Sequence, residues 1–176
     1  NRMGVLRIYD EVAGQPGMED LMMVLAGEPC SPEMTAYITE RHLRRRVVAV
    51  EGPSDEQMCA LYSMASGLLF PSLYEGFGWP IIEAHACGCR VFTTNRPPMT
   101  EVGGASAIYI DPREIKQAAG VIVGALRSGE GGGVGALANA ERFNPSVMIE
   151  GYLAAYRSAL ERCSLRARNG AQGGAM

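Results

Sequence analysis

The segment YEGFGWPIIEAHACG, residues Tyr74–Gly88, holds two glutamates eight positions apart, Glu75 and Glu83. The glycines between them make this part of the chain too flexible for a regular element. Pro80 then suits the first turn of a helix, where its missing N–H is not needed. We therefore expect Glu75 on a loop and Glu83 in the first turn of the helix that follows.

Apolar runs and helix signals alternate along the rest of the chain. Short apolar runs bounded by turn residues predict strands within 20–28, 46–52, 67–72, 89–95 and 106–110. Helical spacing and N-terminal capping signals predict helices within 3–13, 31–42, 54–65, 98–104, 111–126 and 144–163. The caps of four of these helices are expected to be Ser31, Ser54, Asp111 and Asn144. The glycine-rich segment 128–135 is predicted to be a flexible loop.

Strands that alternate with helices need crossover connections, which give a parallel sheet with helices on both faces. The sequence therefore predicts an α/β fold, a Rossmann-like doubly wound parallel sheet. Such a fold normally begins with a strand that is central in the sheet, whereas this sequence opens with a helix. We expect a domain over residues 1–163 that lacks its first strand, followed by a flexible tail over 164–176.

The bulk composition excludes some classes of protein. The 176 residues are 47% apolar and 20% charged, which is typical of a globular domain. A formal net charge of −3 argues against a general nucleic-acid binder, which would usually be basic. No apolar run reaches the ~18 residues of a membrane span. The five cysteines form no disulfide framework, which favours a reduced, cytoplasmic compartment.

The two glutamates lie where a ligand is expected. The predicted strand GLLFPS ends near Ser72, and ligands of doubly wound sheets bind beyond the carboxyl ends of the strands. The N–H groups and dipole at the start of the next helix favour phosphate. A carboxylate at Glu83 can accept hydrogen bonds from a pair of ribose hydroxyls, and Glu75 would face the other end of the ligand. A nucleotide sugar fits this pattern, although glutamates near helix starts also occur for purely structural reasons.

The longer segment PSLYEGFGWPIIEAHACGCRVFTTNRPPMTEVGGASAIYIDP, residues 71–112, closely resembles retaining glycosyltransferases of the GT-B fold. These belong to the large family 4, or group 1, which contains sucrose synthases and many bacterial mannosyl- and glucosyltransferases. Its hallmark is a pair of glutamates with seven residues between them, here Glu75 and Glu83. The resemblance covers nearly the whole chain, and it implies the C-terminal, donor-binding half of such an enzyme.

The resemblance also implies roles for individual residues. Glu83 matches the glutamate that holds the ribose hydroxyls, and Glu75 matches the one near the sugar, the candidate catalytic residue. The loop whose backbone amides contact sugar and pyrophosphate corresponds to Gly76, Phe77, Gly78 and Trp79. The region that lines the base corresponds to Glu51 and Gly52.

The family resemblance implies transfer of a hexose from a UDP-, GDP- or ADP-sugar to an acceptor, with retention of anomeric configuration and no cofactor. Metal is generally not required. The acceptor-binding domain and a pair of phosphate-binding cations would lie before Asn1, so the isolated chain is expected to be inactive. The resemblance leaves peripheral association with the inner face of a membrane open.

Two other functions remain as alternatives: a nucleotide-sugar-binding module without catalysis, and a sugar-nucleotide epimerase of the same fold. Two further motifs are weak. His85, Cys87 and Cys89 lie within five residues, too close together and without a second cluster for a zinc site. GVGALA from Gly133 imitates a dinucleotide fingerprint, but no strand precedes it.

Overall fold

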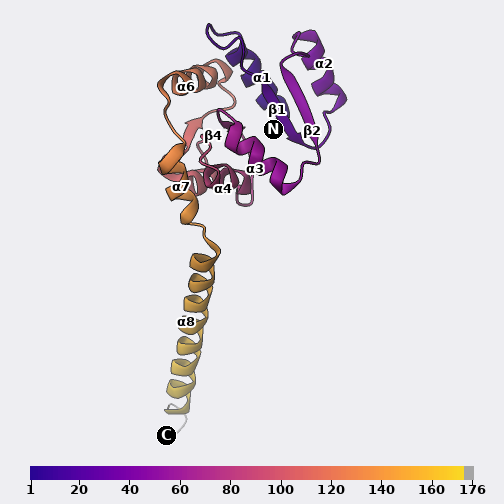
Figure 1. The fold of residues 1–176 in the computed structure, drawn as a ribbon. Helices are drawn as coiled ribbons and strands as arrows, with labels where there is room; N and C mark the ends of the chain where they lie inside the picture. Colours follow the sequence, from indigo (N-terminus) through magenta and orange to yellow (C-terminus); the bar gives the residue numbers. More distant parts are fainter. Residues whose placement is uncertain (173–176) are drawn as a thin grey trace. The chain divides into compact units, whose positions relative to one another are not determined.

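The computed structural model describes residues 1–172. The chain divides into two compact units, the first formed by Asn1–Ala140 and the second beginning at Glu141. The five strands of the described residues all lie in the first unit (Figure 1). The second unit contains one long helix, α8 (Pro145–Gln172).

The strands of the first unit form two parallel sheets. One pairs β1 (Met23–Gly27) with β2 (Val47–Glu51), in the register Met23↔Val47 to Gly27↔Glu51. The other has the order β3-β4-β5, with bounds Leu68–Phe70, Val91–Thr94 and Ile108–Ile110. Every pairing is parallel. The predicted parallel α/β fold is therefore confirmed, but its strands are divided between two sheets.

Helices connect the strands, as expected for parallel pairing. The connecting helices are α2 (Pro32–Glu40), α3 (Asp55–Met64), α4 (Trp79–Ala86) and α5 (Met99–Gly103). Helix α1 (Arg2–Ala13) precedes β1, and α6 (Ile115–Ser128) and α7 (Gly133–Glu141) follow β5. Three predicted caps are confirmed. The Ser31 hydroxyl accepts a hydrogen bond from the backbone of Met34, and Ser54 forms a reciprocal capping box with Gln57. The side-chain oxygen of Asn144 accepts a hydrogen bond of 3.0 Å from the backbone N–H of Ser146 at the start of α8.

Three local expectations differ from the structure. Asp111 does not cap α6, which begins at Ile115; its carboxylate instead accepts hydrogen bonds from the backbone and guanidinium of Arg113. The predicted loop 128–135 contains the start of α7 at Gly133. Helix α8 continues to Gln172, through most of the expected tail 164–176, and residues 173–176 lie outside the described part.

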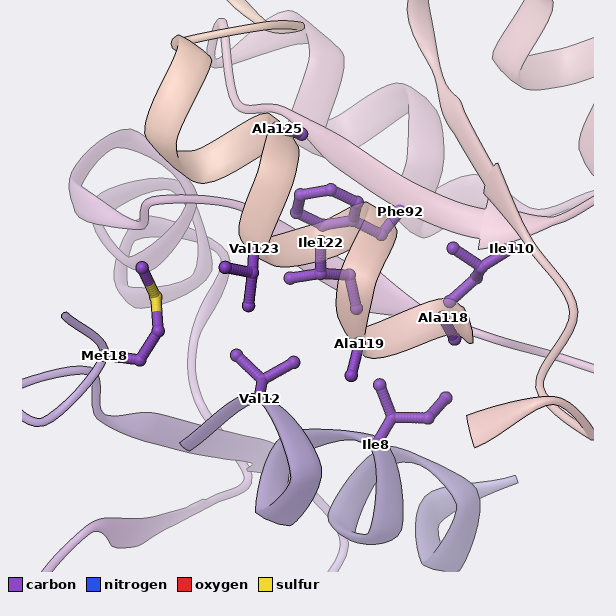
Figure 2. Close-up of a cluster of buried hydrophobic side chains, with 10 residues drawn as sticks. All are labelled: Ile8, Val12, Met18, Phe92, Ile110, Ala118, Ala119, Ile122, Val123 and Ala125. Atoms are coloured by element: carbon purple, nitrogen blue, oxygen red, sulfur yellow. The ribbon is translucent and has the colours of Figure 1, made fainter. Parts of the chain in front are cut away.

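The largest apolar cluster joins α1, α6 and the β3-β4-β5 sheet. Ile8 and Val12 of α1 point toward Ala119 and Ile122 of α6, and Phe92 of β4 lies against the same helix (Figure 2). A second cluster packs Leu6 of α1 against Leu25 of β1. Helix α1 therefore has contacts with both sheets and supports the segments at their carboxyl ends. Among the described residues, no helix combines the length and apolarity needed to cross a membrane.

Candidate functional site

The first glutamate of the pair lies on the loop that follows β3. The carboxylate of Glu75 accepts a hydrogen bond from the Ser72 hydroxyl, with 2.7 Å between the two oxygens. Ser72 is buried, and its own carbonyl accepts a hydrogen bond of 2.7 Å from the hydroxyl of Thr94 at the end of β4. The exposed carboxylate of Glu75 is thus fixed through a buried serine to the next strand of the sheet.

Helix α4 begins directly after this loop, with Gly78 as its N-cap. Gly78 has φ +103°, a left-handed conformation that side chains disfavour. No side chain caps the helix, so the partial positive charge of its first turn is not offset by an N-cap oxygen. This end of α4 lies beside the loop of Glu75 and can receive an anion.

The second glutamate is deeper in the helix than predicted. Because α4 begins at Trp79, Glu83 is its fifth residue and belongs to the second turn. The expectation of a first-turn position is therefore wrong. Residues four apart share a helix face, so Glu83 follows Trp79 on the same side of α4.

Glu83 has a partner from a different helix. The hydroxyl of Tyr62, on α3, donates a hydrogen bond to the Glu83 carboxylate, with 3.2 Å between the oxygens. Tyr62 is buried, whereas Glu83 is exposed. Burial, and then the nearby charge of Glu83, raise the pKa of Tyr62, which keeps this hydroxyl protonated as a donor. The other lone pairs of the Glu83 carboxylate can accept hydrogen bonds from a ligand.

An aromatic pair lies between the two carboxylates in the sequence. The rings of Phe77 and Trp79 have centroids 4.8 Å apart and planes tilted by 57°. Trp79 remains 59% exposed, which leaves an apolar surface next to the polar groups. The backbone at Gly76 is exposed as well, so it can approach a ligand closely.

Glu51 and Gly52 lie at the carboxyl end of the other sheet. Glu51 is the last residue of β2, and Gly52 follows with φ +54° while its N–H donates to the carbonyl of Gly27. Both residues are exposed. Like Glu75, they follow or end a parallel strand at its carboxyl end.

The first turn of α1 lies at the ends of both sheets. The Asn1 side-chain amide donates to the carbonyl of Pro71, directly after β3, at 2.9 Å. The guanidinium of Arg2 donates to the carbonyl of Pro29, after β1, at 2.8 Å. The carboxyl ends of β1 and β3 therefore adjoin the same helix terminus, which supports one continuous site region.

Sequence reasoning missed two positioning residues, Ser72 and Tyr62. Ser72 could have been found as a polar residue at a strand end, whereas Tyr62 looked like an ordinary core residue of α3. Thr94 and Asn95, at the carboxyl end of β4, line a cavity of about 270 Å³ that also contacts Arg96 and Arg113.

The residues of the weak zinc motif, among them His85 and Cys87, have other neighbours in the structure. His85 is buried, and its Nδ1 lies 2.9 Å from the side-chain nitrogen of Asn139. The Cys87 sulfur lies 3.7 Å from that of Cys59 on α3. Within the described part of the chain, no three His, Cys, Asp or Glu side chains are arranged to hold a metal ion.

Comparisons with known proteins identify the family to which this parallel α/β chain belongs. The family model described as "Glycosyl transferases group 1" matches residues 5–131. The chain belongs to this family. It is 29% identical over 116 residues to O-antigen chain mannosyltransferase B of Escherichia coli, and 30% identical over 97 residues to O-antigen chain mannosyltransferase RfbU of Salmonella typhimurium.

These matches cover 65% and 55% of this chain but only 30% and 28% of the two relatives. Among solved structures, the pneumococcal O-GlcNAc transferase GtfA in complex with UDP and GlcNAc matches with a TM-score of 0.76 and 17% identity, over 91% of this chain and 33% of that one. Sucrose-phosphate synthase from Thermosynechococcus elongatus matches with a TM-score of 0.73 and 21% identity, over 92% and 44%. At these identities the structures confirm the GT-B-type fold.

Proposed function

We propose that this chain is the donor-binding half of a retaining glycosyltransferase, which moves a hexose from a nucleotide sugar to an acceptor hydroxyl. The observation that carries the proposal is the anchoring of both glutamates. Glu75 is held by buried Ser72 and Glu83 by buried Tyr62, on either side of the start of α4. Two fixed carboxylates around an anion-binding helix terminus suit a ligand with hydroxyls at both ends and phosphate in the middle.

The donor would extend along this edge of the fold. Its pyrophosphate would accept hydrogen bonds from backbone N–H groups of the loop before α4, at Gly76, Phe77, Gly78 and Trp79. Its ribose hydroxyls would donate to Glu83, as an acidic residue does in dinucleotide-binding folds. The base would lie toward Glu51 and Gly52, and the sugar toward Glu75. The names of the curated mannosyltransferase relatives support a hexose, with mannose as the first to test.

The transfer step follows from this placement. The bond between the sugar C1 and the phosphate oxygen breaks, and the nucleoside diphosphate leaves with the electron pair. The acceptor oxygen forms its bond to C1 on the same face, and its proton passes to the leaving phosphate. Positive charge develops on the sugar, where the Glu75 carboxylate would stabilise it more strongly in the transition state than in the ground state.

The test uses the chain as it is, because donor binding is its proposed part of the reaction. We would titrate it with UDP, GDP and ADP, and then with the corresponding mannose and glucose nucleotides, while following backbone NMR signals. Binding is expected to be weak, with Kd on the order of 1 mM, or about −4 kcal/mol. Signals of residues 75–83 should move.

A matched pair of variants locates the binding. Glu83→Gln should weaken nucleoside diphosphate binding about tenfold or more, since a hydrogen bond to a charged group contributes roughly 1.5–3 kcal/mol. Glu40→Gln, an exposed glutamate at the end of α2, should leave binding unchanged. Unchanged signals at 75–83 with all three nucleotides would exclude the proposal. In a polypeptide that also carries an acceptor-binding domain, a product on the acceptor would separate a transferase from an epimerase or a binding module.

A further inference from the structure

A polar cavity of about 270 Å³ lies at the carboxyl ends of β4 and β5, outside the residues proposed above for the donor. Its walls come from the turn after β4, the end of β5 and the first turns of α6. Ile110 and Ala118, which lie side by side in Figure 2, bring β5 against α6 here. Small-molecule sites usually enclose about 300–1,000 Å³, so this cavity suits one group of a larger ligand.

The cavity carries an excess of positive charge. Its charged side chains are two arginines, Arg96 and Arg113, and one aspartate, Asp111. The guanidinium of Arg113 donates to both carboxylate oxygens of Asp111, over 3.0 Å from Nε and 2.6 Å from Nη2. These hydrogen bonds, and one from the Arg113 backbone N–H, lower the pKa of Asp111 to about 2. The pair is therefore ionised and mutually compensated at neutral pH, and the charge of Arg96 remains.

Arg96 combines a fixed backbone with an unengaged side chain. Its N–H donates to the carbonyl of Thr94 at 2.9 Å, and its carbonyl accepts from the N–H of Thr100 at 3.1 Å. Within residues 1–172, the guanidinium of Arg96 has no hydrogen-bond or ion-pair partner, although the residue is partly buried. A guanidinium presents a planar fork of donors that matches the oxygens of a phosphate or a carboxylate. The cavity thus contains one recognition group for an oxyanion.

The start of α6 adds to the same environment. Gln117, the third residue of this 14-residue helix, lines the cavity with an exposed side chain. The N-cap residue Glu114 makes no side-chain cap hydrogen bond, so the N–H groups of the first turn keep their partial positive charge. An oxyanion in the cavity would therefore meet Arg96 on one wall and the positive end of α6 on another.

Two hydrogen bonds connect the cavity to Glu75. The hydroxyl of Thr94, on the cavity wall, donates to the carbonyl of Ser72, and the hydroxyl of Ser72 donates to the Glu75 carboxylate, both at 2.7 Å. In the sheet order β3-β4-β5, Glu75 follows β3, and the cavity lies at the ends of the next two strands. Glu51, near which the base is proposed to bind, belongs to the other sheet, which Figure 1 shows well apart from β4. Glu75 therefore lies between the cavity and the region proposed for the base.

We propose that this cavity binds an oxyanion, a phosphate or a carboxylate group, carried by the acceptor of the sugar. The assignment to the acceptor rests on the proposed function, in which the sugar lies at Glu75 and the acceptor lies beyond it from the nucleotide. The guanidinium of Arg96 would donate to two oxygens of the group, and the side-chain amide of Gln117 to one. The chain would thereby favour acidic acceptors over neutral ones.

Binding is tested on the chain with two probes, inorganic phosphate and acetate, at an ionic strength held constant with sodium chloride. Backbone NMR signals are followed during each titration. At least one probe should shift the signals of residues 94–96 and 113–118 in a saturable manner, and the tighter probe identifies the group as phosphate or carboxylate. Shifts that do not saturate with either probe, or that lie outside these residues, would overturn the proposal.

Three variants that each lower the net charge of the chain by one locate the site. Arg96→Gln should weaken binding of the tighter probe about tenfold or more, because it removes charge-assisted hydrogen bonds. Gln117→Glu should weaken it as well, since it places a carboxylate on the cavity wall, while acidic residues in a first helical turn favour the fold. Arg45→Gln, at an exposed arginine in the turn before β2, should leave binding unchanged. Equal affinities in all three variants would overturn the proposal.

Competition distinguishes the acceptor from the donor. UDP, GDP or ADP should shift residues 75–83 and leave the affinity of the cavity for the probe unchanged within about twofold. Displacement of the probe by a nucleoside diphosphate would assign the cavity to the donor phosphates, and displacement by UDP-glucuronate but not by UDP would assign it to an acid on the donor sugar. Either result would overturn the proposal.

The two proposals fail in different ways. If no nucleotide shifts residues 75–83, the proposed function is wrong and the assignment to an acceptor falls with it, whereas saturable binding of phosphate or acetate at 94–96 still establishes the oxyanion site. If the nucleotides bind but neither probe does, the donor site stands and the oxyanion site is wrong.

Discussion

The hydroxyl of Tyr62 lies 3.2 Å from a carboxylate oxygen of Glu83, and this hydrogen bond joins α3 to α4 at the candidate site. The donor is buried and the acceptor is exposed. The interaction therefore restricts the rotamers of Glu83 without removing the carboxylate from solvent. A ligand that binds Glu83 would meet a side chain that is already ordered.

Replacing Tyr62 with phenylalanine should weaken nucleoside diphosphate binding by roughly two- to tenfold. Without the Tyr62 hydroxyl, Glu83 would be mobile in the free variant and would become ordered only when the ligand binds. Ordering a mobile side chain costs about 0.5–1.5 kcal/mol. The free energy of unfolding should change by less than about 1 kcal/mol, because water can replace the hydroxyl at an exposed carboxylate. Calorimetric titration measures the first quantity and urea unfolding the second.

The control is Tyr74→Phe, which removes the same hydroxyl from a side chain that is 88% exposed in the same loop region. Equal affinities of the Tyr62 variant and the unmodified chain would show that the Tyr62 hydroxyl does not prepare Glu83 for binding.

The contact between Tyr62 and Glu83 also shows what sequence reasoning could reach. The caps at Ser31 and Ser54 were predictable because each involves residues three positions apart. The contact between α3 and α4 depends on tertiary packing of residues 21 positions apart, for which no local pattern exists. The parallel α/β class followed from alternating elements, whereas the division into two sheets depends on which strands become neighbours.

Helix α7 illustrates a second limit. Gly133 and Gly135 have low helix propensity, so the segment indicated a loop. Burial of Ala136 and Asn139 in the first unit stabilises the helix instead. Likewise, Glu83 was expected in the first turn because the sequence marks Pro80 as the start of α4, which begins one residue earlier, at Trp79.

Replacing Ser72 with alanine should impair the proposed role of Glu75 without affecting that of Glu83. It removes the hydrogen bond to Glu75 and leaves the Glu83 environment intact. We expect a loss of about 1 kcal/mol in the free energy of unfolding. In a catalytically complete polypeptide, kcat should fall while nucleoside diphosphate affinity stays unchanged, because the nucleotide does not depend on Glu75.

The matched control for this variant is Ser106→Ala. The hydroxyl of Ser106 donates a hydrogen bond to the backbone carbonyl of Gly135 and not to a carboxylate, and Ser106 belongs to the short 3-10 helix Gly104–Ser106. The control should show a similar small loss of stability with full kcat. A Ser72 variant that weakened nucleoside diphosphate binding as much as it lowered kcat would contradict the separation.

The buried His85 should make the fold less stable in mild acid. Burial lowers the pKa of His85 below its usual 6.5, so the folded state keeps the ring neutral while the unfolded state can take up a proton. The stabilising contribution is fully present above pH 6.5 and is lost progressively as pH falls below it, down to the folded-state pKa. Urea unfolding from pH 8 to pH 5 measures this dependence, and His85→Gln should reduce it.

Asn139 fixes the neutral ring. Its side-chain nitrogen donates to the Val102 carbonyl at 2.8 Å and lies 2.9 Å from His85 Nδ1, so Nδ1 acts as acceptor and the proton is assigned to Nε2. Asn139→Ala should therefore lower the free energy of unfolding by about 2 kcal/mol or more, since buried partners lose their donor. A variant as stable as the unmodified chain would exclude this role.

Cys59 and Cys87 should form a disulfide under mild oxidation. Their sulfur atoms lie 3.7 Å apart, between α3 and the end of α4, so a small movement brings them within bonding distance. Diamide would take up the two thiol protons and two electrons as the S–S bond forms. Burial raises the pKa of the Cys87 thiol, so the reaction should be faster at alkaline pH.

Peptide mapping by mass spectrometry should find residues 59 and 87 in one linked peptide, with Cys30 and Cys89 not linked to each other or to this pair. The variant Cys59→Ser should give no such product. Preferential linkage of Cys87 to any other cysteine would show that α3 and α4 do not hold the arrangement described above.

The two glutamates should differ in kinetic effect in a polypeptide that carries the complete enzyme. Glu83→Ala removes hydrogen bonds to ribose hydroxyls, which lie far from the breaking bond and change little during reaction. The loss, roughly 1.5–3 kcal/mol, should appear mainly as a raised donor KM and as weaker nucleoside diphosphate binding. Glu75→Ala should mainly lower kcat, because its carboxylate acts on charge that develops at the sugar. The affinity of each variant for nucleoside diphosphate alone is measured by titration. If both changes weakened this affinity equally, Glu75 would act on the nucleotide as Glu83 does, and the assignment of Glu75 to the sugar would be wrong.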